Sequence, residues 1–237
     1  GSMPAEGAAA LPKRTVTSPS LSPPIAPYPT AVKMGDLLFV SGIVGTDSAG
    51  KLVGGTRGKA DMTAQTNQVL GTIEAALGLL GSDASRLVQL RAFVTDWKPL
   101  ERYYRAGRRF LEPRARPTGS TVMSGLALEI EGVAVDGAAL QVVEGPAGPA
   151  SGPYASGGVR AGNLLFASGC TALNSRGRVV GWGSMLEQGR VTLESLGKIP
   201  TSAGFSPGDV MKLFVTVADA RQLAAFERAL VERVGAS

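Results

Sequence analysis

The 237-residue sequence contains no histidine and only one cysteine. The missing histidine excludes Ser-His-Asp and Cys-His catalysis and removes a common ligand of zinc and iron, so no metal is expected. Any proton transfer must therefore use Asp, Glu, Tyr, Lys, Cys or water. The lone Cys170 cannot form an internal disulfide, which fits a reducing compartment, and we predict a cytoplasmic protein.

Aromatic residues and long apolar runs are also scarce. Aromatic side chains make up 5% of the sequence against 32 glycines, which predicts many turns and strands packed with Ala, Val and Leu. No apolar run approaches the about 18 residues that a membrane-spanning helix needs, so no membrane partner is expected.

The sequence has fewer acidic than basic residues, and its net charge of +5 favours anionic partners only weakly. Arginines at helical spacing between Arg102 and Arg109 make one side of a predicted helix basic. Because this side lacks the interleaved aromatics of a single-strand binding platform, a nucleic-acid partner is not expected.

One stretch of the chain occurs twice. Gly35–Gly42 reads Gly-Asp-Leu-Leu-Phe-Val-Ser-Gly, and Gly162–Gly169 reads Gly-Asn-Leu-Leu-Phe-Ala-Ser-Gly. In each copy a tight turn leads into a short apolar strand that ends at Ser-Gly. Ser41 and Ser168 are 127 residues apart, which indicates a duplicated domain rather than a solenoid with units of about 20–50 residues. A tyrosine stands upstream of each copy, at Tyr28 and Tyr154.

Periodicity predicts an α+β fold in which each copy has a mixed sheet with two helices on one face. The first copy should contain a hairpin over Ala31–Val40, helices over Met62–Leu80 and Pro99–Leu111, and strands over Leu87–Thr95, Ser120–Ser124 and Leu128–Val135. The second copy should contain a hairpin over Val159–Ala167, helices over Met185–Leu196 and Ala220–Val234, and a strand over Met211–Val217. It lacks the last two strands, which indicates either truncation or a partner that covers the open edge.

The domain organisation follows from the repeat and from local composition. A first segment rich in Ala, Pro and Ser is expected to be disordered and starts with the remnant of an expression tag, and a Gly/Pro-rich stretch reads as a linker. The predicted units are a disordered N-terminal segment (1–22), a first domain (23–144), a linker (145–152) and an incomplete second domain (153–237).

Several motifs follow one another in a recognisable order. They are Ala-Pro-Tyr ending at Tyr28 with the Leu-Leu-Phe-Val-Ser-Gly strand, Gln65-Thr66, Phe93-Val94-Thr95-Asp96, and Glu129-Ile130-Glu131-Gly132-Val133-Ala134. Together they resemble the RidA/YjgF family of reactive-intermediate deaminases, also labelled L-PSP endoribonucleases. The resemblance implies chorismate-mutase-like domains, trimers or trimer-like homo-oligomers with clefts between subunits, and hydrolysis of imines or enamines to ketones and ammonia without a cofactor.

The same resemblance implies which residues form the site. The family's water-orienting glutamate is present as Glu129, whereas Gly119 occupies the place of the arginine that grips the substrate carboxylate. Arg116 is an alternative anion contact. The candidate catalytic residue is Glu129, and the candidate substrate-binding residues are Tyr28, Ser41, Arg116, Gly119, Ser120 and Thr121.

Three functions stay open from the sequence. The leading one is hydrolytic deamination of a small reactive imine or enamine, or a related cofactor-free step, with Glu129 handling water or a proton. The second is non-catalytic binding or scaffolding of a small carboxylate metabolite, because Gly119 replaces the arginine. A weaker third is an RNA-acting, endoribonuclease-like role. For Ser41 the competing interpretation is structural, and for Cys170 a buried core position is favoured over a reactive thiol.

Overall fold

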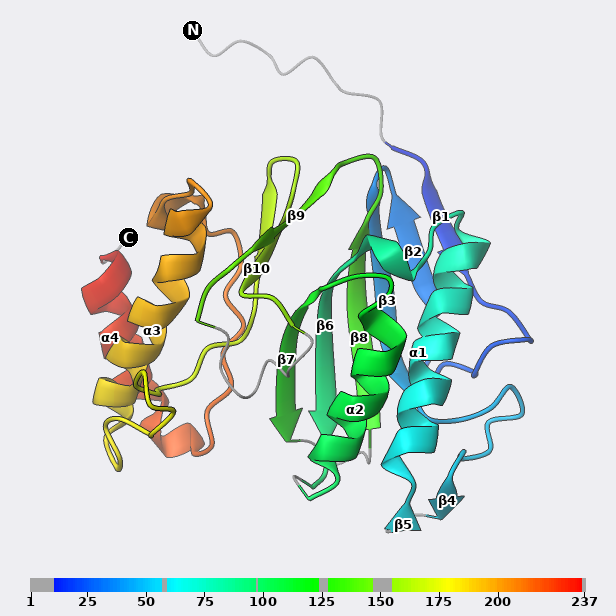
Figure 1. Ribbon diagram of the computed structural model, residues 1–237, viewed down its shortest axis with the longest axis horizontal. Helices are drawn as coiled ribbons and strands as arrows, with labels where there is room; N and C mark the ends of the chain where they lie inside the picture. Colours follow the sequence, from blue (N-terminus) through cyan, green and yellow to red (C-terminus); the bar gives the residue numbers. More distant parts are fainter. Residues whose placement is uncertain (1–10, 57–58, 97, 124–127, 147–154, 236–237) are drawn as a thin grey trace, which may run out of the picture.

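The computed structural model describes residues 11–56, 59–96, 98–123, 128–146 and 155–235 (Figure 1). Tyr154, the tag remnant and most of the predicted linker lie outside the described residues. Two sheets occupy the middle of the molecule, and a pair of helices covers the outer side of each (Figure 1). Among the described residues, no helix combines the length and the apolar character needed to cross a membrane.

The first copy is built on a six-stranded mixed sheet with the order β1-β2-β3-β8-β6-β7. Neighbouring strands are antiparallel except for β6 and β7, which are parallel. β1 lies within the 1–22 segment that we expected to be disordered, so the sheet begins earlier than predicted. The strands are β1 (Lys13–Val16), β2 (Ala31–Met34), β3 (Leu37–Val44), β6 (Leu87–Val94), β7 (Thr118–Met123) and β8 (Leu128–Val135).

Two helices, α1 (Met62–Leu79) and α2 (Leu100–Leu111), cover one face of this sheet (Figure 1). The Asp61 carboxylate caps α1 by accepting two backbone N–H groups of its first turn. The helix ends before Gly81, whose φ of +73° suits glycine. The apolar stripe of α1 is buried against the sheet at Val69, Leu70, Ile73, Ala76 and Leu77. Short elements flank α1: β4 (Gly55–Thr56), β5 (Lys59–Ala60) and the 3₁₀ turn η1 (Ala84–Arg86).

The second copy has a three-stranded sheet in the order β11-β10-β9 and two helices. Its strands begin 127 residues after β1, β2 and β3, and its helices begin 123 residues after α1 and α2. β9 is therefore the counterpart of β1, although it falls within the 23–144 range that we assigned to the first domain. The elements are β9 (Leu140–Val143), β10 (Gly158–Ala161), β11 (Leu164–Ala167), α3 (Met185–Ser202), α4 (Leu223–Val234) and the 3₁₀ turns η3 (Pro207–Asp209) and η4 (Ala220–Gln222).

The two sheets meet face to face. Val88 and Val135 of the first copy form one buried cluster with Val159 and Ala161 of the second. The packed face of the first sheet is the one that points away from α1 and α2, so the order of layers is helix, sheet, sheet, helix (Figure 1). Burial of this common apolar cluster holds the copies together.

The strand predicted over Met211–Val217 is wrong. Val210–Val217 is the counterpart of β6, 123 residues later, but it forms no ladder. In the first copy β6 lies between β8 and β7. The described residues of the second copy contain no counterpart of either strand, so the backbone of this segment has nothing to pair with.

Candidate functional site

Glu129 lies on β8, where it pairs with Val44 of β3 and Phe93 of β6. Strand alternation places it on the face of the first sheet that points away from α1 and α2. Its carboxylate lies over Gly42, because a Cβ built at Gly42 would come within 1.7 Å of Glu129 Oε1. The glycine of the repeated Ser-Gly motif thus makes room for the candidate catalytic group.

The carboxyl of Glu129 has an unusual electrostatic environment. Desolvation raises the pKa of Glu129 above its usual value, and the neighbouring carboxylate of Glu131 raises it further. In the part of the chain that the structure describes, Glu129 takes part in no hydrogen bond or ion pair. Such a group can deliver a proton as an acid and recover one from water as its conjugate base.

Arg91 is a site residue that we did not predict. It pairs with Glu131 across the β6–β8 register, and the two side chains form an ion pair. The Arg91 guanidinium lies 4.0 Å from the ring centroid of Phe214, which belongs to the second copy. The alternation of apolar residues along β6 places Arg91 on the face opposite the buried Leu90. This pattern in the sequence could have identified Arg91 as a neighbour of Glu131.

Gly119, where the resemblance implies the family's arginine, is covered by the second copy. The Gly119 N–H donates to Ser168 Oγ at 3.0 Å, and the Gly119 carbonyl accepts from the Gly169 N–H at 3.0 Å. The neighbouring Ser156 hydroxyl donates to the Arg116 carbonyl at 3.0 Å. These bonds join β7 and the residues just before it to the second copy through one main-chain pair and two serine hydroxyls.

The two repeated serines have the same structural role. Ser41 Oγ donates to the Pro29 carbonyl at 2.8 Å, and Ser168 Oγ donates to the Ser156 carbonyl at 2.5 Å. Each bond closes the loop that precedes its hairpin, twelve residues back along the chain. The structural interpretation of Ser41 is therefore the one that its contacts support.

Arg116 does not join Glu129. Its guanidinium is half exposed and pairs with Glu144 at 3.3 Å. In the strand register Glu129 lies level with Phe93, which pairs with Val122 of β7. Arg116 precedes Val122 by six residues, which is about 20 Å of strand, so its guanidinium belongs to a different part of the surface.

Tyr28 and Thr121 also lie apart from Glu129. Tyr28 lines a hollow of about 490 Å³ together with residues of β1 and a proline-rich loop, and no other candidate lines it. Thr121 is buried on the helix side of the sheet, where it hydrogen-bonds Tyr104 of α2. Ser120, by contrast, pairs in register with Arg91 and lies on the same face as Glu131.

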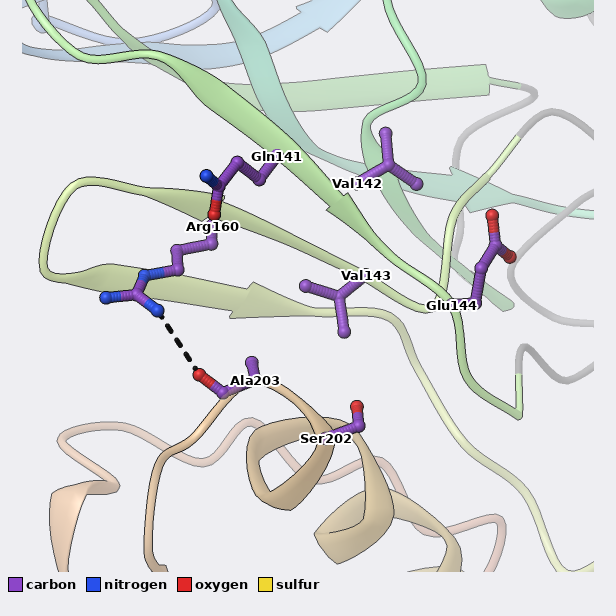
Figure 2. Close-up of a pocket in the computed structure, with 7 residues that line it drawn as sticks. All are labelled: Gln141, Val142, Val143, Glu144, Arg160, Ser202 and Ala203. Carbon is purple, nitrogen blue, oxygen red and sulfur yellow. Dashed lines mark hydrogen bonds between the residues drawn. The ribbon is translucent and has the colours of Figure 1, made fainter.

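A second hollow, of about 440 Å³, lies on the second copy between β9, β10 and the end of α3 (Figure 2). Arg160 points across it and donates to the Ala203 carbonyl at 3.4 Å (Figure 2). Lys33 makes the equivalent bond to the Leu80 carbonyl in the first copy, at 3.5 Å. Because both cations satisfy the C-terminal carbonyls of a helix, this arrangement is structural.

Cys170 is not activated. Burial raises the pKa of its thiol to about 11, and Sγ donates to the Pro146 carbonyl at 3.4 Å. The thiolate, which is the reactive form, is therefore suppressed near neutral pH. No group of three His, Cys, Asp or Glu side chains within the described ranges could hold a metal ion.

Comparison with known proteins decides the family. The model of the family described as "Endoribonuclease L-PSP" matches residues 19–136 and again residues 146–237. The chain belongs to this family, which is the RidA/YjgF family. The two matches agree with the duplication inferred from the repeated Leu-Leu-Phe stretch.

Individual relatives of this RidA-family chain cover about one copy. It is 30% identical over 116 residues to the 3-aminoacrylate deaminase RutC of Acinetobacter baylyi, which is 49% of this chain and 88% of that protein. A RutC family protein of Pyrococcus horikoshii is 33% identical over 85 residues, or 35% of this chain and 64% of that protein. RidA from an Antarctic Psychrobacter species matches with a TM-score of 0.46 at 24% identity, covering 52% of this chain and 98% of that one.

Proposed function

We propose that the first copy hydrolyses a small imine or enamine to a carbonyl compound and ammonia at Glu129, and that this substrate carries no carboxylate. The observation that supports the reaction is the unpaired Glu129 carboxyl, with its raised pKa, above Gly42. Family membership supports reactive-intermediate deamination in general, and a relative is named a 3-aminoacrylate deaminase.

The reaction needs one group that first donates a proton and later accepts one. A protonated Glu129 would protonate the enamine carbon and leave an iminium ion beside the new carboxylate. That carboxylate would then take a proton from water as the water oxygen bonds to the iminium carbon, which gives a carbinolamine. Collapse of the carbinolamine releases ammonia and the carbonyl compound, and Glu129 has regained its proton.

The charges around Glu129 favour a substrate without a carboxylate. Once Glu129 has given its proton to the substrate, Glu129 and Glu131 carry two negative charges, and Arg91 supplies a single positive charge that is already paired with Glu131. A substrate carboxylate would then face an excess of negative charge, whereas the iminium ion formed in this step would be attracted. Gly119 offers no side-chain cation, and its main-chain groups are occupied by the second copy.

The test compares two imines made in place by an oxidase: one from an amino acid, which carries a carboxylate, and one from the corresponding amine, which does not. We expect the purified full chain to accelerate ammonia release from the second imine more than from the first. Glu129→Gln should lower that rate by about 10²-fold or more, because general acid–base catalysis supplies 10²–10⁴. Glu101→Gln, on the exposed side of α2, is the matched control. No acceleration of either imine, or an unchanged Glu129→Gln variant, contradicts the proposal.

A second candidate is a non-catalytic binding or scaffolding role. The observation that favours it is the closed contact at Gly119, where the second copy covers the strand edge at which relatives place an arginine. This role predicts that small metabolites raise the melting temperature of wild type and of Glu129→Gln equally, because ligand binding to the folded state alone stabilises it. A trimer-like assembly remains part of both proposals. An RNA-acting role is weaker, because Arg105 and Arg108 of α2 pair with Glu101 and Glu112.

A further inference from the structure

Val210–Val217 exposes a row of apolar side chains on an unpaired backbone. Apart from the N–H of Val210, which donates to Pro207, its backbone makes no hydrogen bond to the described residues. An unpaired row of N–H and C=O groups that carries apolar side chains is a template for another strand. Its large exposed side chains are Val210 (55% exposed), Met211 (84%), Phe214 (52%) and Val215 (39%).

Each face of this segment makes one contact, whereas the backbone edges of Met211–Val217 make none with the described residues. Leu213 packs against the buried cluster formed by Leu193 of α3 with Phe226 and Ala229 of α4. On the opposite face, Phe214 stacks on Arg91 of the first copy. The position and the face orientation of a strand are therefore set, while the hydrogen-bonding groups on either side remain open.

We propose that Val210–Val217 pairs antiparallel with the same segment of a second copy of this chain, about a two-fold axis. In the first copy the neighbour of β6 is β8, and this pair is antiparallel. A two-fold axis perpendicular to the segment makes two identical segments antiparallel, so a second copy can supply a neighbour with the orientation that β8 has.

The residues of the segment also fit the place that β8 fills in the first copy. β8 turns Leu128, Ile130 and Ala134 toward the helices, all at even spacing along the strand. Leu213, Val215 and Val217 have the same spacing, so a second segment would present apolar side chains to α3 and α4. The eight residues contain no proline, no glycine and one charged residue, Lys212, so nothing in them blocks a ladder.

A proline scan of the full chain tests the pairing. In an antiparallel pair each edge uses the N–H groups of alternate residues, and proline removes the N–H. We expect proline at one set of alternate positions to halve the mass of the wild-type particle in light scattering, and proline at the other set to leave the mass unchanged. One set is Leu213 and Val215, and the other is Lys212, Phe214 and Thr216. Because the backbone of Met211–Val217 makes no hydrogen bond to the described residues, the circular dichroism of the variants should be unchanged.

Trp182→Ala is the matched control, since Trp182 is 85% exposed but lies outside the segment. It should leave the mass unchanged. If light scattering shows that the wild-type chain is a monomer, the proposal is wrong and the open edge belongs to a different strand. A mass that no proline alters, or that every proline alters alike, also overturns it, because only the N–H groups of alternate residues take part in the ladder.

Discussion

The two copies begin with matching elements and end with different cores. In the first copy α1 and α2 pack on a six-stranded sheet, and 23 buried apolar residues among those described form one cluster. Among the described residues of the second copy, α3 and α4 form a cluster with three buried members. The helices have the same lengths in both, so the difference lies in the sheet beneath them. Local sequence is enough to specify a helix, but a core requires the strands that it packs on.

The largest expected effect compares Leu90 with Leu213, which hold the same place in the two copies. Leu90 is 1% exposed within the main cluster, so Leu90→Ala should lower the free energy of unfolding by about 2–5 kcal/mol. Leu213 is only partly buried, and Leu213→Ala should cost about 1 kcal/mol or less. Urea denaturation of the two variants measures both values. Equal losses would show that the second copy is as well packed as the first.

Elements with strong local patterns were predictable. The helix predicted over Met62–Leu80 ends within one residue of the observed α1, because its apolar stripe and its Asp61 cap are encoded locally. β1 was missed, since Lys13–Val16 has a burial pattern with only one buried residue and no apolar alternation. The strand over Met211–Val217 was predicted with good strand residues, yet its ladder depends on partners far away in the chain.

Part of the geometry around Glu129 was predictable. Glu129 was singled out by its motif, and its carboxyl is desolvated and has no partner among the described residues, while its acid–base role stays a prediction. The contact of Gly119 with Ser168 could not be predicted, because it depends on how the two copies pack. The same holds for Phe214 on Arg91. Residues within one strand were predictable from alternation, whereas contacts between the copies were not.

The next comparison is between the two Ser-Gly glycines. Gly42→Ala would put a Cβ within 1.7 Å of Glu129 Oε1, so the carboxylate must move away. If Glu129 acts as proposed, the rate of imine hydrolysis should fall by about 10²-fold, which is near the lower limit of general acid–base catalysis. A Cβ at Gly169 would come closest to Ser120 Oγ, at 2.7 Å, so Gly169→Ala should leave the rate within about threefold, a change of less than 1 kcal/mol. Ammonia release under identical conditions measures both, and equal rates would remove Glu129 from the reaction.

The paired serines should differ in stability. Ser168 is 1% exposed, donates to Ser156 and accepts from Gly119, so Ser168→Ala leaves two buried groups unpaired and should cost about 1–3 kcal/mol. Ser41 is half-buried and makes one such bond, so Ser41→Ala should cost about 0.5–1.5 kcal/mol. Thermal unfolding of the two variants provides the comparison. A larger loss at Ser41 would indicate that the contact between the copies contributes little.

The smallest expected effect is the pH dependence that Glu129 adds to the first copy. Its pKa is raised in the folded state, so between the unfolded and folded pKa values the folded protein binds more protons than the unfolded chain does. The stabilisation that protonated Glu129 provides is therefore fully present below the pKa of the unfolded state and is lost as the pH rises through the raised pKa of the folded state. Glu129→Gln should thus increase the melting temperature relative to wild type at pH 8 and change it less at pH 4. Glu101→Gln should show no such trend, and a larger gain at pH 4 than at pH 8 would mean that folding stabilises the charged form of Glu129.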